Sequence, residues 1–223
     1  MPKKICVLIP SYNEARTIGG LVCDLRARHL TVYVVDDGSA DDTASIAESA
    51  GAVVVKHKKN MGKGASLREG FKHILKKGFD AVIVMDGDGQ HRVPDIDNFI
   101  GTMEATGADI IIGDRMHDVK NMPAERVYTN KFMSSLISMI AGQHIPDSQS
   151  GFRLIKRAVL ERVRLKSSNY EIESELIIKA ARAGFRIGTA PIKTIYSDEV
   201  SRINPVMDTL RFISFIVRSF FER

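Results

Sequence analysis

Apolar residues follow two alternating patterns along the first half of the chain. Short runs rich in Val and Ile are typical of buried strands, and the stretches between them repeat apolar residues every three or four positions, as amphipathic helices do. The predicted strands are 5–10, 32–35, 53–56, 81–85 and 109–113, and the predicted helices are 17–28, 42–50, 63–77 and a segment after Pro94. This alternation predicts an α/β fold with a largely parallel sheet and helices on both faces.

Polar segments lie at the carboxyl ends of four of these predicted strands. They are residues 10–14, 36–39, 86–88 and 113–115. In an open parallel sheet, ligands bind at the carboxyl ends of the strands. We therefore expect these segments to form one ligand site.

The segment after strand 81–85 carries the clearest chemistry. Asp86, Asp88 and Gln90 alternate with glycines, so two carboxylates and an amide oxygen can converge on one hard divalent cation. Ions such as Mg²⁺ are held by one or two carboxylates, and substrate phosphates complete the shell. A polar turn that closes the strand explains the same residues, and the motif alone leaves both interpretations open.

The composition fits a single soluble domain. The chain has 223 residues, of which 44% are hydrophobic and 26% charged, as in ordinary globular proteins. Residues 1–150 carry 18 Lys and Arg against 19 Asp and Glu, whereas residues 151–223 carry 14 against 8. A basic C-terminal part suits anionic lipid or phosphate-bearing substrates. Nucleic acid is disfavoured, because the basic residues are dispersed and lack interleaved aromatic side chains.

Two common nucleotide-binding motifs are absent. No GxGxxG follows the first strand, and residues 60–66 lack the spacing of a P-loop. Their glycines and Lys63 instead predict a helix start with free N–H groups near an anion. Cys6 and Cys23 lie in apolar patterns and are predicted to be small buried side chains. With no export signal visible, this cysteine usage predicts a cytoplasmic protein.

Six segments in order resemble the family 2 glycosyltransferases, and within that family the dolichyl-phosphate and polyprenyl-phosphate hexose synthases. These segments are 9–14, 35–43, 60–64, 85–91, 113–115 and 147–153. The resemblance covers about residues 4–200 and implies the glycosyltransferase A fold, a Rossmann-like, mostly parallel sheet flanked by helices. It also implies a metal-dependent, inverting transfer of one hexose from a GDP- or UDP-hexose.

The resemblance assigns residues to the donor and the metal. The implied nucleotide site consists of Pro10, Tyr12, Glu14, Asp36, Asp37, Lys63 and Asp86. Asp86, Asp88 and Gln90 would hold Mg²⁺ or Mn²⁺, and Asp88 would be catalytic. An Asx-type turn and N-cap with Ser39 could account for Asp37 and less easily for Asp36, and two adjacent acids at a strand end favour the site.

A second group of residues is implied for the acceptor. A lipid phosphate is already anionic and needs placement by cations more than deprotonation, and Arg115, Arg153 and Arg202 are its predicted partners. For Arg115 the alternative is a solvated surface arginine. Glu173 is the predicted base if the acceptor is a hydroxyl. His91 would stand behind the metal ligands or, equally well, be an exposed loop histidine.

The C-terminal part predicts an amphipathic helix. One face of segment 205–223 carries Val206, Leu210, Ile213, Val217 and Phe220. The segment is too short and too charged to span a bilayer. It suits either a membrane interface or a core or homodimer contact. Residues 1–200 are thus predicted to form the transferase domain, and residues 201–223 an acceptor loop and helix. The amphipathic stretch 132–141 is a second candidate cover for a lipid acceptor.

Departures from the family leave alternatives open. The chain has no Trp and so lacks the QxxRW signature of processive synthases, which implies a single transfer. Segment 196–205 lacks the Gly-Ser-Lys expected after its arginine, so donor and acceptor stay open. We favour a polyprenyl phosphate at the inner face of the cytoplasmic membrane. The alternatives are a soluble transferase with a sugar or protein hydroxyl acceptor and a non-catalytic, phospho-receiver-like regulatory domain.

Overall fold

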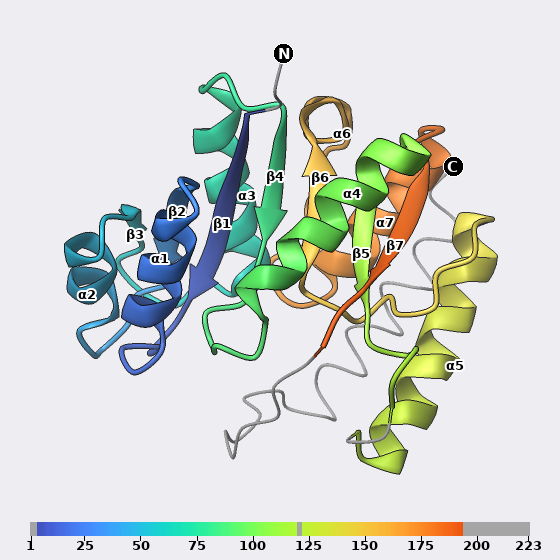
Figure 1. Cartoon of the computed structure of the whole chain (residues 1–223), viewed down its shortest axis with the longest axis horizontal. Coiled ribbons are helices and arrows are strands. Elements are labelled where there is room, and N and C mark those ends of the chain that lie inside the picture. Colours follow the sequence, from blue (N-terminus) through green and yellow to red (C-terminus); the bar gives the residue numbers. More distant parts are fainter. Residues whose placement is uncertain (1–3, 120–121, 194–223) are drawn as a thin grey trace.

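The computed structural model describes residues 4–119 and 122–193, which form a seven-stranded sheet between two layers of helices (Figure 1). The strands are β1 (Ile5–Ser11), β2 (Thr31–Asp36), β3 (Val53–Lys56), β4 (Ala81–Val84), β5 (Ile110–Asp114), β6 (Arg153–Lys156) and β7 (Ile187–Pro191). The helices are α1 (Ile18–Ala27), α2 (Thr43–Ser49), α3 (Lys63–Leu75), the short 3₁₀ helix η1 (Val93–Asp95), α4 (Ile96–Thr106), α5 (Ala124–Ala141), α6 (Arg157–Arg162) and α7 (Ile172–Arg182).

The sheet has the order β3-β2-β1-β4-β6-β5-β7. Neighbouring strands run parallel except around β6, which pairs antiparallel with both β4 and β5. The predicted parallel α/β sheet is therefore confirmed, and β6 is the exception to its direction. Neither β6 nor β7 was predicted, because β6 has four residues and begins and ends with a basic side chain, and β7 is interrupted by glycine.

Each face of the sheet has its own hydrophobic core. Along β1, Cys6 and Leu8 point to the layer with α3 and α7, whereas Val7 and Ile9 point to the layer with α1 and α4. A strand buried on both faces needs a continuous apolar run, which explains why the pattern of β1 was easy to recognise. Gly70 brings α3 against this strand, because a Cβ there would collide with Leu8.

The predicted elements agree closely with the observed ones, with a few differences. Helix α5 begins at Ala124, before the predicted amphipathic stretch 132–141. Cys6 is buried as predicted, but the prediction was wrong for Cys23, which is exposed because it lies on the outer side of α1. The predicted C-terminal helix lies outside the described residues. Within the described part of the chain, no helix is long and apolar enough to cross a membrane.

Candidate active site

Three loops that follow parallel strands are tied together at the carboxyl edge of the sheet. The register places Ser11 at the end of β1 beside Asp36 at the end of β2. The backbone N–H of Asn13 donates to the Ser39 hydroxyl at 2.9 Å, which joins the loops after β1 and β2. The Thr17 hydroxyl donates to the Gly87 carbonyl at 2.6 Å, which joins the start of α1 to the loop after β4. Three of the four predicted segments, 10–14, 36–39 and 86–88, therefore lie together at this edge, and their role as a ligand site stays a prediction.

The two adjacent acids after β2 have different partners. Asp36 accepts a hydrogen bond from the Ser39 hydroxyl. The Asp37 carboxylate lies at 2.7 Å from His57 Nδ1 and accepts from the backbone N–H groups of Met61 and Gly62 at 2.9 and 2.8 Å. The turn with Ser39 therefore involves Asp36, and Asp37 holds the loop before α3. Both carboxylates are buried at the edge where the nucleotide was predicted to bind.

The start of α3 is closed by protein groups. The Ala65 N–H donates to the Ser168 carbonyl at 3.1 Å, and Met61 and Gly62 donate to Asp37 as described. The prediction of free N–H groups was wrong for these three residues, because Asp37 and the loop before α7 accept their hydrogen bonds. Gly64 allows this contact, since a Cβ there would lie 2.7 Å from the Ser167 carbonyl oxygen.

Lys63 forms the centre of a partly buried ionic cluster. Its Nζ lies 2.6 Å from Asp86 Oδ1 and 2.7 Å from Glu173 Oε1, and 5.8 Å from the centre of the Tyr170 ring. Burial acts to lower the pKa of Lys63, but the Asp86 and Glu173 carboxylates outweigh it and raise the pKa above its ordinary value. For Asp86, burial acts to raise the pKa, and Lys63 and His91 lower it by a larger amount. Lys63 and Asp86 are therefore both charged at neutral pH.

Asp88 is a partly buried carboxylate with different surroundings. Its Oδ1 accepts the Gln90 backbone N–H at 2.9 Å, and no ion pair to it occurs among the described residues. Burial and the Asp86 charge both raise its pKa. A carboxylate whose charge is disfavoured in this way is stabilised by a nearby cation. The pair Asp86 and Asp88, with the Gln90 amide, thus fits a hard divalent ion whose other ligands come from a substrate.

The described residues hold no group of three or more His, Cys, Asp or Glu side chains arranged to bind a metal by themselves. The predicted set, with two carboxylates and an amide, is consistent with that finding, because it relies on ligands from outside the protein.

His91 lies behind this set of predicted metal ligands. Its Nε2 is 3.5 Å from Asp86 Oδ2, and its ring packs on Phe152 with the ring centres 4.9 Å apart. The alternative of an exposed loop histidine was wrong, since the residue is buried.

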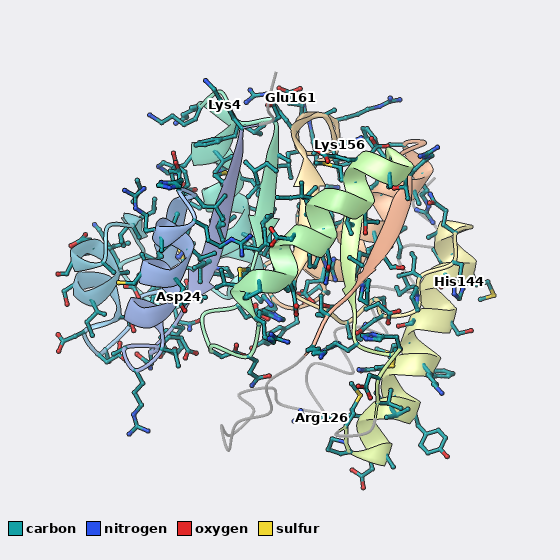
Figure 2. All side chains as sticks on the ribbon, viewed as in Figure 1. Lys4, Asp24, Arg126, His144, Lys156 and Glu161 are labelled. Carbon is teal, nitrogen blue, oxygen red and sulfur yellow. The ribbon has the colours of Figure 1, made fainter. Side chains whose placement is uncertain are left out.

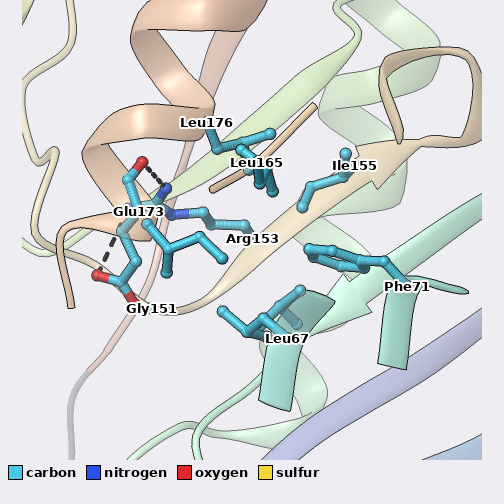
Figure 3. A pocket seen from close by; sticks show the side chains of 10 residues that line it. Leu67, Phe71, Gly151, Arg153, Ile155, Leu165, Glu173 and Leu176 are labelled. Carbon is cyan, nitrogen blue, oxygen red and sulfur yellow. Dashed lines mark hydrogen bonds and ion pairs between the residues drawn. The ribbon is translucent and has the colours of Figure 1, made fainter. Parts of the chain in front are cut away.

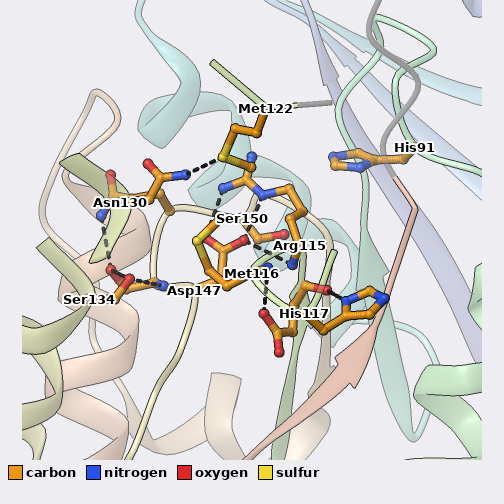
Figure 4. Close-up of polar contacts among 12 residues, drawn as sticks. His91, Arg115, Met116, His117, Met122, Asn130, Ser134, Asp147 and Ser150 are labelled. Carbon is orange, nitrogen blue, oxygen red and sulfur yellow. Dashed lines mark hydrogen bonds and ion pairs between the residues drawn. The ribbon is translucent and has the colours of Figure 1, made fainter. Parts of the chain in front are cut away.

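Arg115 is held by a buried residue of segment 147–153 for which the sequence predicted no role. Its Nε and Nη2 donate to the two carboxylate oxygens of Asp147 at 2.6 and 2.8 Å, and its backbone N–H donates to Asp147 at 3.2 Å (Figure 4). The Asp147 side chain is completely buried. Arg115 is therefore an anchored side chain, and the alternative of a solvated surface arginine was wrong.

Arg153 lies deeper than a residue that opens onto a ligand surface. It is 2% exposed, and its Nε, Nη2 and Nη1 donate to the carbonyls of Ser150, Ser148 and Glu173 at 2.8, 2.8 and 2.6 Å. Figure 3 shows the guanidinium beside Glu173, next to the apolar side chains that line a small pocket. These contacts hold the turn before β6 against α7. The role of Arg153 as a phosphate clamp stays a prediction, and Arg202 lies outside the described residues.

Gly151 was missed as a site residue, although it lies in the motif 147–153. A Cβ on Gly151 would collide with Asp86 Oδ2 and lie 3.0 Å from Lys63 Nζ. The glycine therefore lets the backbone of the turn close over the Lys63–Asp86 pair. Its position between Ser150 and Phe152 gave no indication of this contact, which depends on the direction of β6.

The chain matches the model of glycosyl transferase family 2 over residues 6–164. It belongs to this family. The glycosyltransferase is 30% identical to the UDP-N-acetylglucosamine–dolichyl-phosphate N-acetylglucosaminyltransferase of Methanococcus voltae, over 88% of this chain and 87% of that enzyme. It is 31% identical to the polyprenol monophosphomannose synthase of Mycolicibacterium smegmatis, over 85% of this chain and 77% of that enzyme.

The fold of this glycosyltransferase has counterparts among solved structures. Glucosyl-3-phosphoglycerate synthase from Mycobacterium tuberculosis, in complex with Mn²⁺, UDP-glucose and phosphoglyceric acid, superimposes with a TM-score of 0.76 at 18% identity. The match covers 97% of this chain and 79% of that structure. At this identity the likeness shows the fold alone, which confirms the predicted glycosyltransferase A fold. Membership of the family excludes the non-catalytic receiver-like interpretation.

We expect Arg153→Met to destabilise the protein by at least about 3 kcal/mol, because it leaves three carbonyls and the nearby Glu173 carboxylate without their buried donor. Arg164→Met is the matched control, since Arg164 is exposed and surface changes usually stay within about 0.5 kcal/mol. Urea unfolding followed by circular dichroism measures both. Equal stability of the two variants would contradict the structural role of Arg153.

Proposed function

We propose that this glycosyltransferase transfers one hexose from a UDP- or GDP-hexose to a polyprenyl phosphate, with inversion and with the help of a divalent cation. The observation that carries the proposal is the pair of partly buried carboxylates, Asp86 and Asp88, at the sheet edge where the acids after β2 also converge. The solved structures with Mn²⁺ or Mg²⁺ and UDP support the choice of donor and ion. The lipid acceptor is supported by relatives named for dolichyl, polyprenol and undecaprenyl phosphates.

In this proposal each loop at the carboxyl edge of the sheet has its own role. Pro10, Tyr12 and Glu14 line the base and ribose pocket, together with the acids after β2. Bound at Asp86, Asp88 and Gln90, the cation would stabilise the negative charge that develops on the departing nucleoside diphosphate. A carboxylate accepts hydrogen bonds only, which suits Asp36 and Asp37 to the N–H of a base and the hydroxyls of a ribose.

The proposed partners of the acceptor phosphate are arginine side chains. Arg115, fixed by Asp147, presents a planar guanidinium at the end of β5, and such groups suit phosphate oxygens. Arg153 and Arg202 complete the predicted set. A phosphate acceptor is already a nucleophile at neutral pH, so a single displacement needs no base. Glu173 then serves as the partner of Lys63, and it becomes the candidate base only if the acceptor is a hydroxyl.

Helix α5 supports contact with a membrane. Tyr128, Phe132 and Met139 are 75%, 69% and 68% exposed, and their spacing places them on one face of the helix. Exposed Lys131 and Arg126 lie nearby in the sequence. Arg126 lies on the side where the parallel strands end, whereas Lys156 and Glu161 lie at the opposite side (Figure 2). Aromatic and basic residues together suit the headgroup region of a bilayer, so we propose a peripheral protein.

The assay that tests the proposal mixes labelled UDP- and GDP-hexoses with short polyprenyl phosphates, Mn²⁺ or Mg²⁺, and the full chain. Label that moves into the organic phase as a polyprenyl-phosphate hexose supports the lipid acceptor. Label that instead moves to an added sugar or protein hydroxyl favours the soluble alternative. No transfer from any nucleotide hexose would contradict the proposal.

We expect Asp88→Ala to lower turnover at least about 100-fold, in the range found on loss of a charge-stabilising group. EDTA should lower the activity of the wild type in the same way. The measurement is turnover at saturating donor with the metal present or chelated. Activity that persists unchanged in EDTA would contradict the metal assignment.

Asp36→Ala and Asp37→Ala should each raise the donor KM and change kcat less, because contacts to a remote base are similar in the ground and transition states. Asp37→Ala should also lower thermal stability, since three donors lose their acceptor. Donor titration by calorimetry, paired with thermal unfolding, separates the two effects. Donor affinity within about twofold of the wild type for both variants would exclude these acids from the nucleotide pocket.

Removal of residues 205–223 should release the protein from liposomes that contain anionic lipid, because basic residues contribute roughly 1 kcal/mol each near such a surface. Raised salt should partly release the full chain as well. Phe132→Ser should weaken binding through α5, and Thr129→Ser, an exposed position on the same helix, is its control. Sedimentation with liposomes measures all of these. Binding that is unchanged by truncation would reject this placement of the C-terminal segment.

A further inference from the structure

Lys63 already occupies one of the predicted metal ligands. Its ammonium lies 2.6 Å from Asp86 Oδ1, while its second contact, at 2.7 Å, is Glu173. The lysine side chain is 14% exposed, and the Gly151 backbone closes over the pair. Asp86 therefore carries a strongly bound internal cation, whereas Asp88 has no ion-pair partner among the described residues. One acid of this short motif is thus paired with a cation, and the other is not.

This difference has a consequence for any ion that uses both acids. A divalent cation and an ammonium that share one carboxylate repel each other, and the repulsion is strong where little water screens it. Metal binding to Asp86 thus requires Lys63 to withdraw. Glu173 is its second ion-pair partner, so the lysine can leave Asp86 and still keep one anionic partner. A diphosphate at the same edge of the sheet would offer a further anion to the ammonium.

We propose that Lys63 holds Asp86 when no donor is bound and so weakens metal binding until the donor diphosphate takes over the lysine charge. Metal and donor would then bind as a coupled pair, and the empty protein would retain little metal. The proposal rests on the proposed function, in that it takes the donor to be a nucleoside diphosphate sugar and the ion to be divalent. It assigns Lys63 a role as a positioning residue that competes with the metal.

The test measures Mn²⁺ binding to the full chain by electron paramagnetic resonance without nucleotide. Lys63→Gln should bind Mn²⁺ at least about tenfold more tightly than the wild type, since coupled neighbouring charges interact at this level. Lys63→Met is the second variant. Lys72→Gln is the matched control, because Lys72 lies on the same helix, is 70% exposed and changes the net charge equally. Unchanged or weaker binding in both Lys63 variants would overturn the proposal, and so would an equal gain in Lys72→Gln.

The variant Glu173→Gln distinguishes competition between the lysine and the metal from a general loosening of the ionic cluster. It removes the Lys63–Glu173 pair but leaves the lysine on Asp86, so nucleotide-free Mn²⁺ affinity should not rise. A rise equal to that of Lys63→Gln would overturn the proposal, because loosening alone would then explain both.

A measurement on chains that keep Lys63 covers the case in which its replacements fail to fold. Without nucleotide, Asp86→Asn should weaken Mn²⁺ binding less than about threefold, because the lysine already occupies that carboxylate, whereas Asp88→Asn should weaken it more than about tenfold. Equal losses would overturn the proposal. The experiments use neither sugar nor lipid. Failure of sugar transfer with a tighter-binding Lys63→Gln would therefore contradict the proposed reaction and leave the role of Lys63 supported.

Discussion

The arrangement of this site depends on the neutralisation of buried charge. Asp86, Lys63, Glu173 and Arg153 form a continuous chain of alternating charges, with separations of 2.6, 2.7 and 3.7 Å between neighbours. Removing one member would leave each neighbour with one partner fewer in a cluster that water reaches poorly, which costs more than the loss of an exposed ion pair. The chain joins the end of β4 and the start of β6 to the starts of α3 and α7, so the electrostatic requirement also fixes how these elements meet.

The antiparallel strand β6 makes this possible. It enters the sheet between β4 and β5, so the turn that precedes it passes over the carboxyl edge of the parallel strands. That turn carries Asp147, which anchors Arg115, and Gly151, which packs on Asp86 and Lys63. Two loops distant in sequence are thereby fixed by one reversal of strand direction. The site is stiff on this side, because its polar groups bond to backbone and to buried partners.

Residues at the carboxyl edge of the sheet both stabilise the fold and are proposed to bind the donor. Asp37 illustrates this, since its carboxylate holds the loop before α3 through three donors and also lies where a base and ribose are proposed to bind. Asp88 is the contrasting case. Its burial and the nearby Asp86 charge disfavour its ionised form, and a bound cation would relieve that cost. In the proposed function, residues of the first kind would shape the nucleotide site, and residues of the second kind would favour a positively charged ligand.

The sequence alone determined the parallel part of the fold and the set of segments at its carboxyl edge. Strands such as β1 are buried on both faces and are encoded as continuous apolar runs, and the alternation with helices dictates the parallel order. The acids after β2 and β4 were found because they follow those runs directly. Only the tertiary structure decided which partner each charge has. Lys63 faces Asp86 and Glu173, Arg115 faces Asp147, and Arg153 turns inward, because these pairs join residues far apart in the chain, and a local pattern carries no information about such contacts.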